Sequence, residues 1–273
     1  MTAAWFGDGL VALEAGSVTL DDHGLTTGDG CFETLKVVDG TPFALTRHLR
    51  RLARSCAGLG LSPPDDGLVR RACAETIAAN RPGVGRVRIT VTGGRAPLGS
   101  GRGDAGTTLA VLTGPPANWD PTAAVVVCPW VRNERSAVAG LKTTSYAENV
   151  VALAWAAERG ATEALFGNTR DELCEGTGTN VFVVLDGALV TPPLDSGCLA
   201  GITRELLVEC TDAVEAAVPI GMLASCAEAF LTSSTRDVQP IELLDGRQLR
   251  APGPVTATMQ DAWRTLEAES LDP

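Results

Sequence analysis

The sequence predicts an α+β protein of two domains. Its 273 residues are enough for about two domains of ordinary size. Residues 1–113 hold two hairpin patterns, two helical patterns and a further pair of strands, which is typical of an antiparallel sheet covered by helices. The prolines and glycine of 114–121 break both strand and helix, so we expect the interdomain linker there. Residues 122–273 are then the larger C-terminal domain.

The composition indicates a globular protein that binds neither nucleic acid nor membrane. Hydrophobic residues make up 45% of the chain and charged residues 20%. The formal net charge is -11, and no cluster of Lys and Arg is clear of neighbouring acids, which argues against a nucleic-acid surface. No apolar stretch is long enough to span a bilayer, and no basic region precedes one near the N-terminus. We therefore expect a cytoplasmic protein.

The cysteines and histidines argue against disulfides, metal sites and a Ser-His-Asp triad. The eight cysteines form no C-x-x-C pair and mostly have apolar neighbours, so we expect reduced, buried thiols. Only His23 and His48 are present, which is too few for a histidine metal site. We expect no bound metal.

Two hairpins are predicted at the start of the chain. Segments 4–6 and 10–12 flank a Gly-Asp-Gly turn. Segments 31–38 and 41–45 flank Asp39-Gly40, a dipeptide that favours a tight hairpin turn. The first domain is therefore expected to begin with antiparallel strands.

Two helices should follow the second hairpin. Thr46 can cap the first, which has apolar residues at helical spacing and ends at Gly60, a residue suited to a helix C-terminus. Asp65, after two prolines, introduces the second, which should end near 81–83.

A glycine- and arginine-rich loop, 93–106, joins the next two predicted strands, 86–92 and 107–113. Two interpretations of this loop stay open. It is either a flexible surface loop, or a substrate lid in which Arg95 and Arg102 bind carboxylates.

The second domain should mix strands and helices. A continuous apolar strand is expected at 123–130, and a helix over 146–159 with an inward face of Val150, Leu153, Ala154 and Ala157. Further strands are predicted at 163–166, 180–185, 188–191 and 228–232, and helices from Gly201 onward and over about 255–271.

Lys142 is conspicuous because it is one of only two lysines, and the only tyrosine, Tyr146, follows it closely. An arginine cannot form an imine with an aldehyde, whereas a lysine can. A chain that uses arginine almost everywhere and keeps Lys142 is expected to need a primary amine there. From this stretch alone, a surface lysine at the start of a helix is an equally good interpretation.

Three features after Lys142 decide between these interpretations. Glu175 lies in a small-residue turn before a strand, Gly201 begins a helix whose N-terminus suits a phosphate, and 233–235 is a hydroxyl-rich turn. Alone, each is an ordinary turn or cap. Together, a lysine, a carboxylate and two phosphate-binding turns are what a pyridoxal phosphate site needs.

The same residues carry a family resemblance that spans nearly the whole chain. It resembles the class IV pyridoxal-phosphate enzymes, of fold type IV, in the following motifs: Glu175, Thr177, Asn180-Val181-Phe182, Leu189-x-Thr191, Leu199-x-Gly201-Ile202-x-Arg204, Gly28 to Glu33, and His48-x-x-Arg51-Leu52. The resemblance implies a small N-terminal α/β domain with an antiparallel sheet, a larger C-terminal α/β domain, and the cofactor between them. It also implies a homodimer.

The resemblance assigns roles to individual residues. Lys142 is implied to bond covalently to pyridoxal 5'-phosphate and to be the catalytic base, and Glu175 to face the pyridine nitrogen. Tyr146 lies close to where some members have a tyrosine beside the phenolic oxygen of the cofactor. Leu199 would pack on the ring, and the phosphate would be held by Arg51, Ile202, Thr203, Ser234 and Thr235.

The subfamily resemblance favours a lyase. Residues 28–32 and 37–40 look most like 4-amino-4-deoxychorismate lyases, whereas a D-amino-acid transaminase would have a tyrosine in place of Phe32 and an Arg-x-His motif at 98–100. Two features oppose the lyase: Lys142 lacks the asparagine usual three residues on, and Glu33 replaces a smaller residue. We count Phe32, with Arg95 and Arg102, as a substrate-binding candidate.

The function expected from the sequence is therefore the elimination of pyruvate from aminodeoxychorismate to give 4-aminobenzoate for folate synthesis. The alternative is a class IV aminotransferase acting on D-amino acids or branched-chain amino acids. A second alternative is a protein that binds pyridoxal phosphate without turnover. All three share the cofactor site and differ in what the bound substrate undergoes.

Overall fold

The structure is a computed structural model that describes residues 3–273. Contacts within the chain divide it into two compact units. The first consists of the chain up to Ala117 together with 141–146 and 271–273, and the second of 118–140 and 147–270. The segment that carries Lys142 therefore belongs to the first unit, whereas Glu175 belongs to the second.

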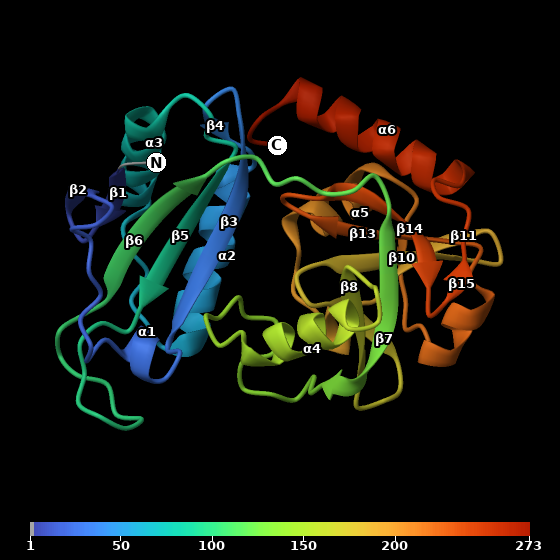
Figure 1. The fold of residues 1–273 in the computed structure, drawn as a ribbon, viewed down its shortest axis with the longest axis horizontal. Coiled ribbons are helices and arrows are strands. Elements are labelled where there is room, and N and C mark those ends of the chain that lie inside the picture. Colours follow the sequence, from blue (N-terminus) through green and yellow to red (C-terminus); the bar gives the residue numbers. More distant parts are fainter. Residues whose placement is uncertain (1–2) are drawn as a thin grey trace. The chain divides into compact units, whose positions relative to one another are not determined.

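The first unit is built on an antiparallel sheet of six strands in the order β2-β1-β6-β5-β3-β4 (Figure 1). Both predicted hairpins and the predicted strand pair are confirmed. Asp39 and Gly40 have positive φ angles, as a tight hairpin turn requires. The strands are β1 (Ala3–Phe6), β2 (Gly9–Ala12), β3 (Gly30–Val38), β4 (Thr41–Pro42), β5 (Arg86–Thr92) and β6 (Thr108–Gly114).

Two long helices, α2 (Leu45–Leu59) and α3 (Asp66–Asn80), pack against one face of this sheet, and a short helix, α1 (His23–Thr26), precedes β3. The buried core between helices and sheet includes Leu35, Leu52, Ile77 and Ile89.

The predicted ends of these helices are confirmed except at one position. Asp65 caps α3 by accepting a hydrogen bond from the Leu68 N–H, and Gly60 ends α2 in the left-handed conformation. The prediction that Thr46 caps α2 is wrong. The helix begins at Leu45, after Ala44 in the left-handed conformation, so its N-cap lies two residues earlier than predicted. Thr46 instead hydrogen-bonds Asp272 near the C-terminus.

The second unit is built on a mixed sheet of nine strands, in the order β12-β11-β10-β13-β14-β7-β8-β9 with β15 paired to β14. The pairs β7–β8, β7–β14 and β11–β12 are parallel and the other pairs antiparallel. The strands are β7 (Ala123–Arg132), β8 (Glu163–Asn168), β9 (Leu173–Gly176), β10 (Asn180–Leu185), β11 (Ala188–Thr191), β12 (Val214–Glu215), β13 (Glu228–Ser233), β14 (Asp237–Leu244) and β15 (Arg247–Gln248).

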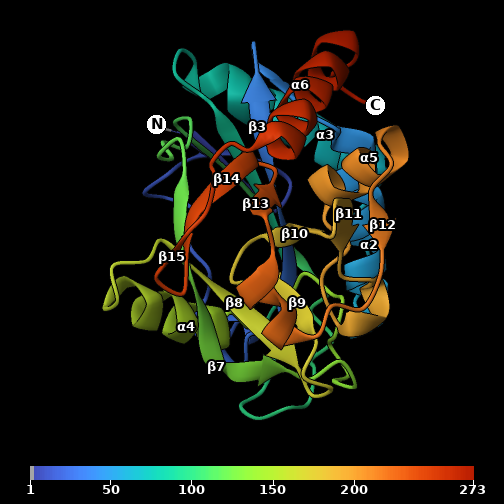
Figure 2. The same cartoon turned by 90° about the vertical axis from the view of Figure 1, so that its right-hand side faces the viewer.

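The helices of the second unit pack on different strands of its sheet. Helix α4 (Ala147–Ala157) packs on β7 and β8, whereas α5 (Ile202–Cys210) packs on β13 and α6 (Pro254–Glu269) on β13 and β14 (Figure 2). Two 3₁₀ turns, η1 (Leu194–Ser196) and η2 (Ile220–Ser225), lie in the connections. All three predicted helices are confirmed.

The buried face of α4 differs from the prediction. The structure buries Asn149, Ala152 and Ala156, while Val150 is 63% exposed and Leu153 is 41% exposed. The helix is apolar on nearly all sides, so its sequence pattern does not single out an inward face. Small residues let α4 approach the sheet closely, whereas Val150, Val151 and Leu153 face outward.

The cysteines agree with the sequence prediction, since all eight are free thiols and all except Cys210 are buried. Within residues 3–273, no helix combines the length and the apolar character needed to cross a membrane.

Candidate active site

Lys142 lies in a segment, 141–146, that is held along strand β3. The Phe32 N–H donates to the Lys142 carbonyl at 3.0 Å, and the Thr144 N–H donates to the Gly30 carbonyl at 2.8 Å. The Lys142 N–H donates to the Ser55 hydroxyl of α2 at 3.2 Å. The lysine is half-buried and its backbone is fixed by both a strand and a helix. It is therefore not an ordinary surface lysine at the start of a helix.

Two aromatic rings lie beside the Lys142 amine. The Nζ atom is 4.5 Å from the ring centroid of Phe32 and 5.9 Å from that of Tyr146. The two rings meet edge to face with their centroids 5.2 Å apart. The structure thus brings Phe32 and Tyr146, both singled out from the sequence, to the amine.

Arg51 pairs with a buried carboxylate. Its Nε and Nη2 atoms donate to the two oxygens of Glu33 at 2.8 and 2.6 Å, and His48 Nδ1 lies 2.7 Å from Oε2 of the same carboxylate. Burial alone would raise the pKa of Glu33, but the Arg51 and His48 side chains hold it at about 2. The role of Arg51 as a phosphate ligand stays a prediction.

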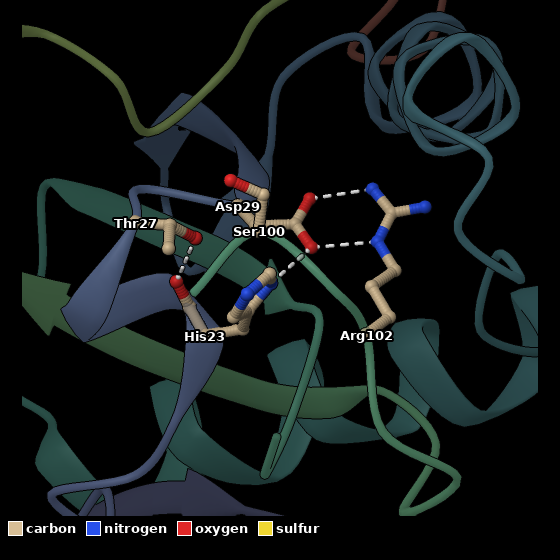
Figure 3. A pocket seen from close by; sticks show the side chains of 5 residues that line it. All are labelled: His23, Thr27, Asp29, Ser100 and Arg102. Carbon is tan, nitrogen blue, oxygen red and sulfur yellow. Dashed lines mark hydrogen bonds and ion pairs between the residues drawn. The ribbon is translucent and has the colours of Figure 1, made fainter. Parts of the chain in front are cut away.

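The other two candidate arginines hold the 93–106 loop to the 21–29 segment. Arg102 donates from Nε and Nη2 to the Asp29 carboxylate at 2.7 and 2.6 Å, and Arg95 Nη2 donates to Asp21 at 2.9 Å. A cavity of about 460 Å³ lies beside this anchor (Figure 3). Its lining consists of His23, Thr27, Asp29, Ser100 and Arg102. The proposed contact of these arginines with substrate stays a prediction.

His23 reinforces the same anchor. Its Nδ1 atom lies 2.8 Å from a carboxylate oxygen of Asp29 (Figure 3). Its Nε2 atom lies 2.9 Å from the Gly99 carbonyl. Both ring nitrogens face oxygen acceptors, and only the protonated imidazole can donate to both. The Asp29 carboxylate, followed by the Gly99 carbonyl, raises the pKa of His23.

Glu175 lies within strand β9, not in the turn that the sequence predicted, because Leu173, Glu175 and Gly176 pair with β8 and the Leu173 and Cys174 side chains are buried. Its Oε2 atom accepts from the Leu199 N–H at 2.9 Å, and Oε1 accepts from Arg132 Nε at 3.2 Å. Glu175 and Leu199 are thus brought together, and the carboxylate is held in one orientation.

Arg132, at the end of β7, was not identified from the sequence. Besides Glu175 it hydrogen-bonds Asn149 and Glu148 at the start of α4, and its guanidinium stacks 4.0 Å from the Phe166 ring centroid. It fixes the position of Glu175 relative to the helix. Nothing in its local sequence distinguishes it from an ordinary arginine at a strand end.

The N-terminus of α5 is open for an anion. Gly201 supplies no side-chain cap, and no acceptor within residues 3–273 takes the N–H groups of Ile202 and Thr203 or the Thr203 hydroxyl. A Cβ at Gly201 would lie 1.9 Å from Asn180 Oδ1, so only glycine fits. The donors and the helix dipole suit a phosphate group.

The hydroxyl turn at 233–235 follows β13, the strand on which α5 packs. Ser234 and Thr235 are half-buried in this turn, and the Arg236 N–H donates to the Ser233 hydroxyl at 3.2 Å. The hydroxyl of Thr232, at the same end of β13, is buried and has no hydrogen-bond partner among residues 3–273. A buried polar atom of this kind is expected to have a partner, so the turn also fits an oxygen-rich ligand.

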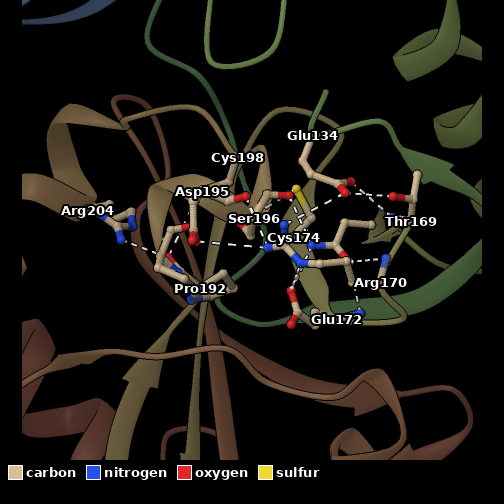
Figure 4. Close-up of polar contacts among 12 residues, drawn as sticks. Glu134, Thr169, Arg170, Glu172, Cys174, Pro192, Asp195, Ser196, Cys198 and Arg204 are labelled. Atoms are coloured by element: carbon tan, nitrogen blue, oxygen red, sulfur yellow. Dashed lines mark hydrogen bonds and ion pairs between the residues drawn. The ribbon is translucent and has the colours of Figure 1, made fainter. Parts of the chain in front are cut away.

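A polar network fixes the connection that leads to Leu199 (Figure 4). Arg170 donates to Glu172 at 2.8 Å and to the Asp195 carbonyl at 3.1 Å. Arg204 donates to the Pro192 carbonyl at 2.7 Å and pairs with Glu215. Charged side chains thus hold the connection at Pro192 and Asp195, ahead of Leu199 in the chain.

The first unit holds a fixed primary amine, and the second holds an oriented carboxylate and two sets of phosphate-type donors. These are the kinds of group that a pyridoxal phosphate enzyme uses. The chain belongs to the amino-transferase class IV family, which it matches over residues 30–244. It is thus a class IV enzyme that uses pyridoxal 5'-phosphate, as an aminotransferase or a lyase. The alternative of a cofactor-binding protein without turnover is not retained.

Relatives of different activity are similarly close. A D-alanine aminotransferase of Bacillus licheniformis is 28% identical over 90% of each chain. A bifunctional aminodeoxychorismate lyase / D-amino acid transaminase of Mycobacterium tuberculosis is 30% identical, covering 89% of this chain and 91% of the relative.

Among solved structures, a branched-chain aminotransferase of Thermoproteus uzoniensis is similar with a TM-score of 0.89 and 27% identity, covering 97% of this chain and 94% of the other. The expected fold is confirmed: a small antiparallel N-terminal sheet and a larger mixed C-terminal sheet, as in fold type IV.

Proposed function

We propose that this protein is an amino-acid aminotransferase, which moves an amino group from an amino acid to a 2-oxo acid. The observation that carries the proposal is the half-buried Lys142 amine, whose backbone is fixed to β3 and α2 and whose side chain lies beside Phe32 and Tyr146. The aminotransferase names of the relatives support this activity over the lyase. Glu33, and the absence of an asparagine three residues after Lys142, support it from the sequence.

Lys142 and Glu175 have the central roles in this proposal. When bound, pyridoxal phosphate supplies an aldehyde that takes up the amine of the substrate and a ring that withdraws electrons. Lys142 is the attachment point for that aldehyde and moves the proton at the amine-bearing carbon. The Glu175 carboxylate, oriented by Leu199 and Arg132, holds a proton on the pyridine nitrogen.

The remaining proposed cofactor contacts are backbone N–H groups, hydroxyl groups, a guanidinium and an apolar side chain. The Ile202 and Thr203 N–H groups at the start of α5 are proposed to bind the phosphate. Leu199 packs on the ring, and Tyr146 lies beside the phenolic oxygen. The other phosphate ligands in this proposal are the Ser234 and Thr235 hydroxyls and Arg51.

A homodimer is part of the proposal. Outward-facing apolar side chains on α4 include Val150, Val151 and Leu153, all more than 40% exposed. A cluster of this kind on a helix surface is typical of an interface with another protein. The proposal is that a second copy of this chain covers it.

The second candidate function is 4-amino-4-deoxychorismate lyase. The Gly-Asp-Gly-Cys-Phe stretch at 28–32 favours it, and the bifunctional relative carries both the lyase and the transaminase name. The lyase would release pyruvate and 4-aminobenzoate without an amino acceptor.

The test supplies the purified protein, loaded with pyridoxal phosphate, with D-alanine or branched-chain amino acids plus 2-oxoglutarate, and separately with aminodeoxychorismate. We expect amino transfer that requires the oxo acid. Formation of 4-aminobenzoate and pyruvate without an oxo acid would support the lyase instead, and consumption of no substrate would overturn both. Borohydride should fix the cofactor to Lys142 in the wild type and in the matched control Lys36→Ala, but not in Lys142→Ala.

A further inference from the structure

Arg88 lies on the sheet face of the first unit that is opposite α2 and α3. Along β5, Val87, Ile89 and Val91 are fully buried in the core, so the alternating residues Arg88 and Thr90 point to the other face.

The pairing of β5 with β3 identifies the other residues on this face of the sheet. The register pairs Thr90 with Phe32 and Arg88 with Thr34 of β3. Paired residues of an antiparallel sheet lie on the same face. Arg88 and Phe32 therefore occupy one surface, and the 141–146 segment lies against β3 beside it.

Arg88 and Lys142 contact the same aromatic ring. The Arg88 Cζ atom is 3.8 Å from the Phe32 ring centroid, and the Lys142 Nζ atom is 4.5 Å from it. Arg88 Nε also lies 3.3 Å from the Thr90 hydroxyl. A guanidinium is thus held in a defined orientation beside the reactive amine.

Arg88 has no acidic partner within the described part of the chain, in contrast to Arg51, Arg95 and Arg102, which each pair with a carboxylate. Stacking on Phe32 covers the flat face of the guanidinium without neutralising its charge. The N–H groups along its edge are arranged so that two of them can donate parallel hydrogen bonds to one carboxylate. The arrangement is that of an anion-binding group whose anion is not supplied by the protein.

We propose that Arg88 binds the carboxylate of the substrate while the amine of the same substrate reacts at the Lys142 position. This assignment rests on the proposed function and deepens it. The substrates are then amino carboxylic acids in preference to amines without a carboxylate. Arg88 takes the role for which the sequence had suggested Arg95 and Arg102, both of which are engaged in anchoring their loop.

The test compares wild type, Arg88→Gln and Arg88→Lys on matched substrates: D-alanine against ethylamine, and L-leucine against 3-methylbutylamine. Loss of a hydrogen-bonded ion pair should raise the KM for the amino acid about 10- to 150-fold in Arg88→Gln. Arg88→Lys keeps the positive charge but loses the paired N–H groups of the guanidinium. Its KM for the amino acid should therefore lie between that of wild type and that of Arg88→Gln. The kcat/KM for the amine should not fall.

Inhibition by propanoate, a carboxylate without an amine, gives a second readout. Its inhibition constant should rise by the same factor in Arg88→Gln, while the visible absorbance of the cofactor stays unchanged. Arg86→Gln, on the same strand and face, is the matched control and should leave KM and the inhibition constant within about two-fold of wild type.

The outcomes separate the two proposals. If the wild type transfers amino groups and Arg88→Gln keeps the wild-type KM and inhibition constant, the assignment of Arg88 is overturned and the proposed function stands. If Arg102→Gln and not Arg88→Gln raises the KM, the lid arginine binds the carboxylate instead. If the wild type consumes no amino acid, the proposed function fails, and direct calorimetric binding of propanoate to wild type and Arg88→Gln still tests Arg88.

Discussion

The backbone N–H of Leu199 donates to the Glu175 carboxylate at 2.9 Å, and the Leu199 carbonyl accepts from the Asn180 amide at 2.8 Å. One residue of an irregular loop is thereby held by two strands, β9 and β10, that follow each other in the chain. The apolar side chain proposed to pack on the cofactor ring and the carboxylate proposed to face its nitrogen are positioned by the same contacts. A change at either residue should therefore disturb both.

Replacing Glu175 by Gln should leave the fold intact and lower kcat roughly 10²- to 10³-fold, the loss typical for one oriented electrostatic group in an active site. The amide cannot hold a proton on the pyridine nitrogen as a carboxylate does. Steady-state kinetics with a fixed amino donor measures the effect. Glu158→Gln, an exposed carboxylate on the same unit, is the control and should retain wild-type kcat. Equal rates for Glu175→Gln and wild type would remove Glu175 from the mechanism.

Gly201→Ala should destabilise the protein by about 1–3 kcal/mol, because the added methyl group would lie 1.9 Å from Asn180 Oδ1. The shift of Asn180 should also weaken binding of pyridoxal phosphate at the start of α5. Denaturant unfolding and cofactor titration measure the two effects. Gly221→Ala is the matched control, since a Cβ there meets nothing within 4 Å. Unaltered stability and cofactor affinity in Gly201→Ala would contradict the close packing.

Glu33→Gln should cost about 3–5 kcal/mol of stability, because it leaves the buried Arg51 guanidinium without its counter-ion. The control is Glu75→Gln, an exposed partner of Arg71 whose loss should cost no more than about 1 kcal/mol. Chemical denaturation of both variants at neutral pH makes the comparison.

The Glu33 carboxylate should also make the stability of the folded protein depend on pH. The pKa of Glu33 is lowered from 4.5 to about 2 in the folded protein, so its contribution is complete above pH 4.5 and is lost as the pH falls toward 2. Stability measured across this range should decline more steeply for wild type than for Glu33→Gln. Parallel profiles would show that Glu33 is not the group being titrated.

His23 should make the anchoring of the 93–106 loop depend on pH in the opposite sense. Its pKa is raised above 6.5, mainly by Asp29, so the protonated form is bound more strongly. The anchor is complete below pH 6.5 and weakens as the pH rises through the higher pKa of the folded state. Hydrogen exchange of the loop, corrected for intrinsic rates, should lose protection over that rise in wild type and show no such step in His23→Gln. Amides of α3 serve as the internal control.

A charge on the outer face of α4 should disrupt the proposed homodimer. Val150 is 63% exposed and lies within the apolar cluster of that helix, so Val150→Glu should shift the protein to a monomer without loss of helix content. Sedimentation velocity measures the state. Leu20→Glu, at a leucine that is 87% exposed outside this cluster, should behave as wild type. A monomeric wild type would rule out the dimer at the outset.

Local signals in the sequence predicted much of the fold. The Asp-Gly dipeptide specified the hairpin between β3 and β4, and Asp65 and Gly60 marked helix ends, because each of these effects involves only neighbouring residues. Glu175 was assigned to a turn because a strand of four residues is too short to show alternation. Its identification as a site residue came from the motif around it and not from its predicted conformation.

The residues that sequence reasoning missed depend on contacts between distant strands. Arg88 and Arg132 are ordinary strand arginines in the sequence, and only the register of β3 with β5, or the contact of β7 with β9, gives them a neighbouring site residue. Arg95 and Arg102 were predicted to bind substrate carboxylates because they lie in a loop rich in glycine and arginine. Their actual partners, Asp21 and Asp29, are about seventy residues away along the chain.

The assembly of the first unit from three separate stretches of chain limits how this enzyme can be divided. A fragment ending at Ala117 would contain the whole six-stranded sheet and its three helices but would lack Lys142. Lys142 lies in a separate six-residue segment, 141–146, which binds along β3 through backbone hydrogen bonds. A nick in the loop after β7 would leave that segment in place. The two fragments would then form a split enzyme in which the second fragment supplies the lysine segment that binds along β3 of the first, not a pair of independent modules.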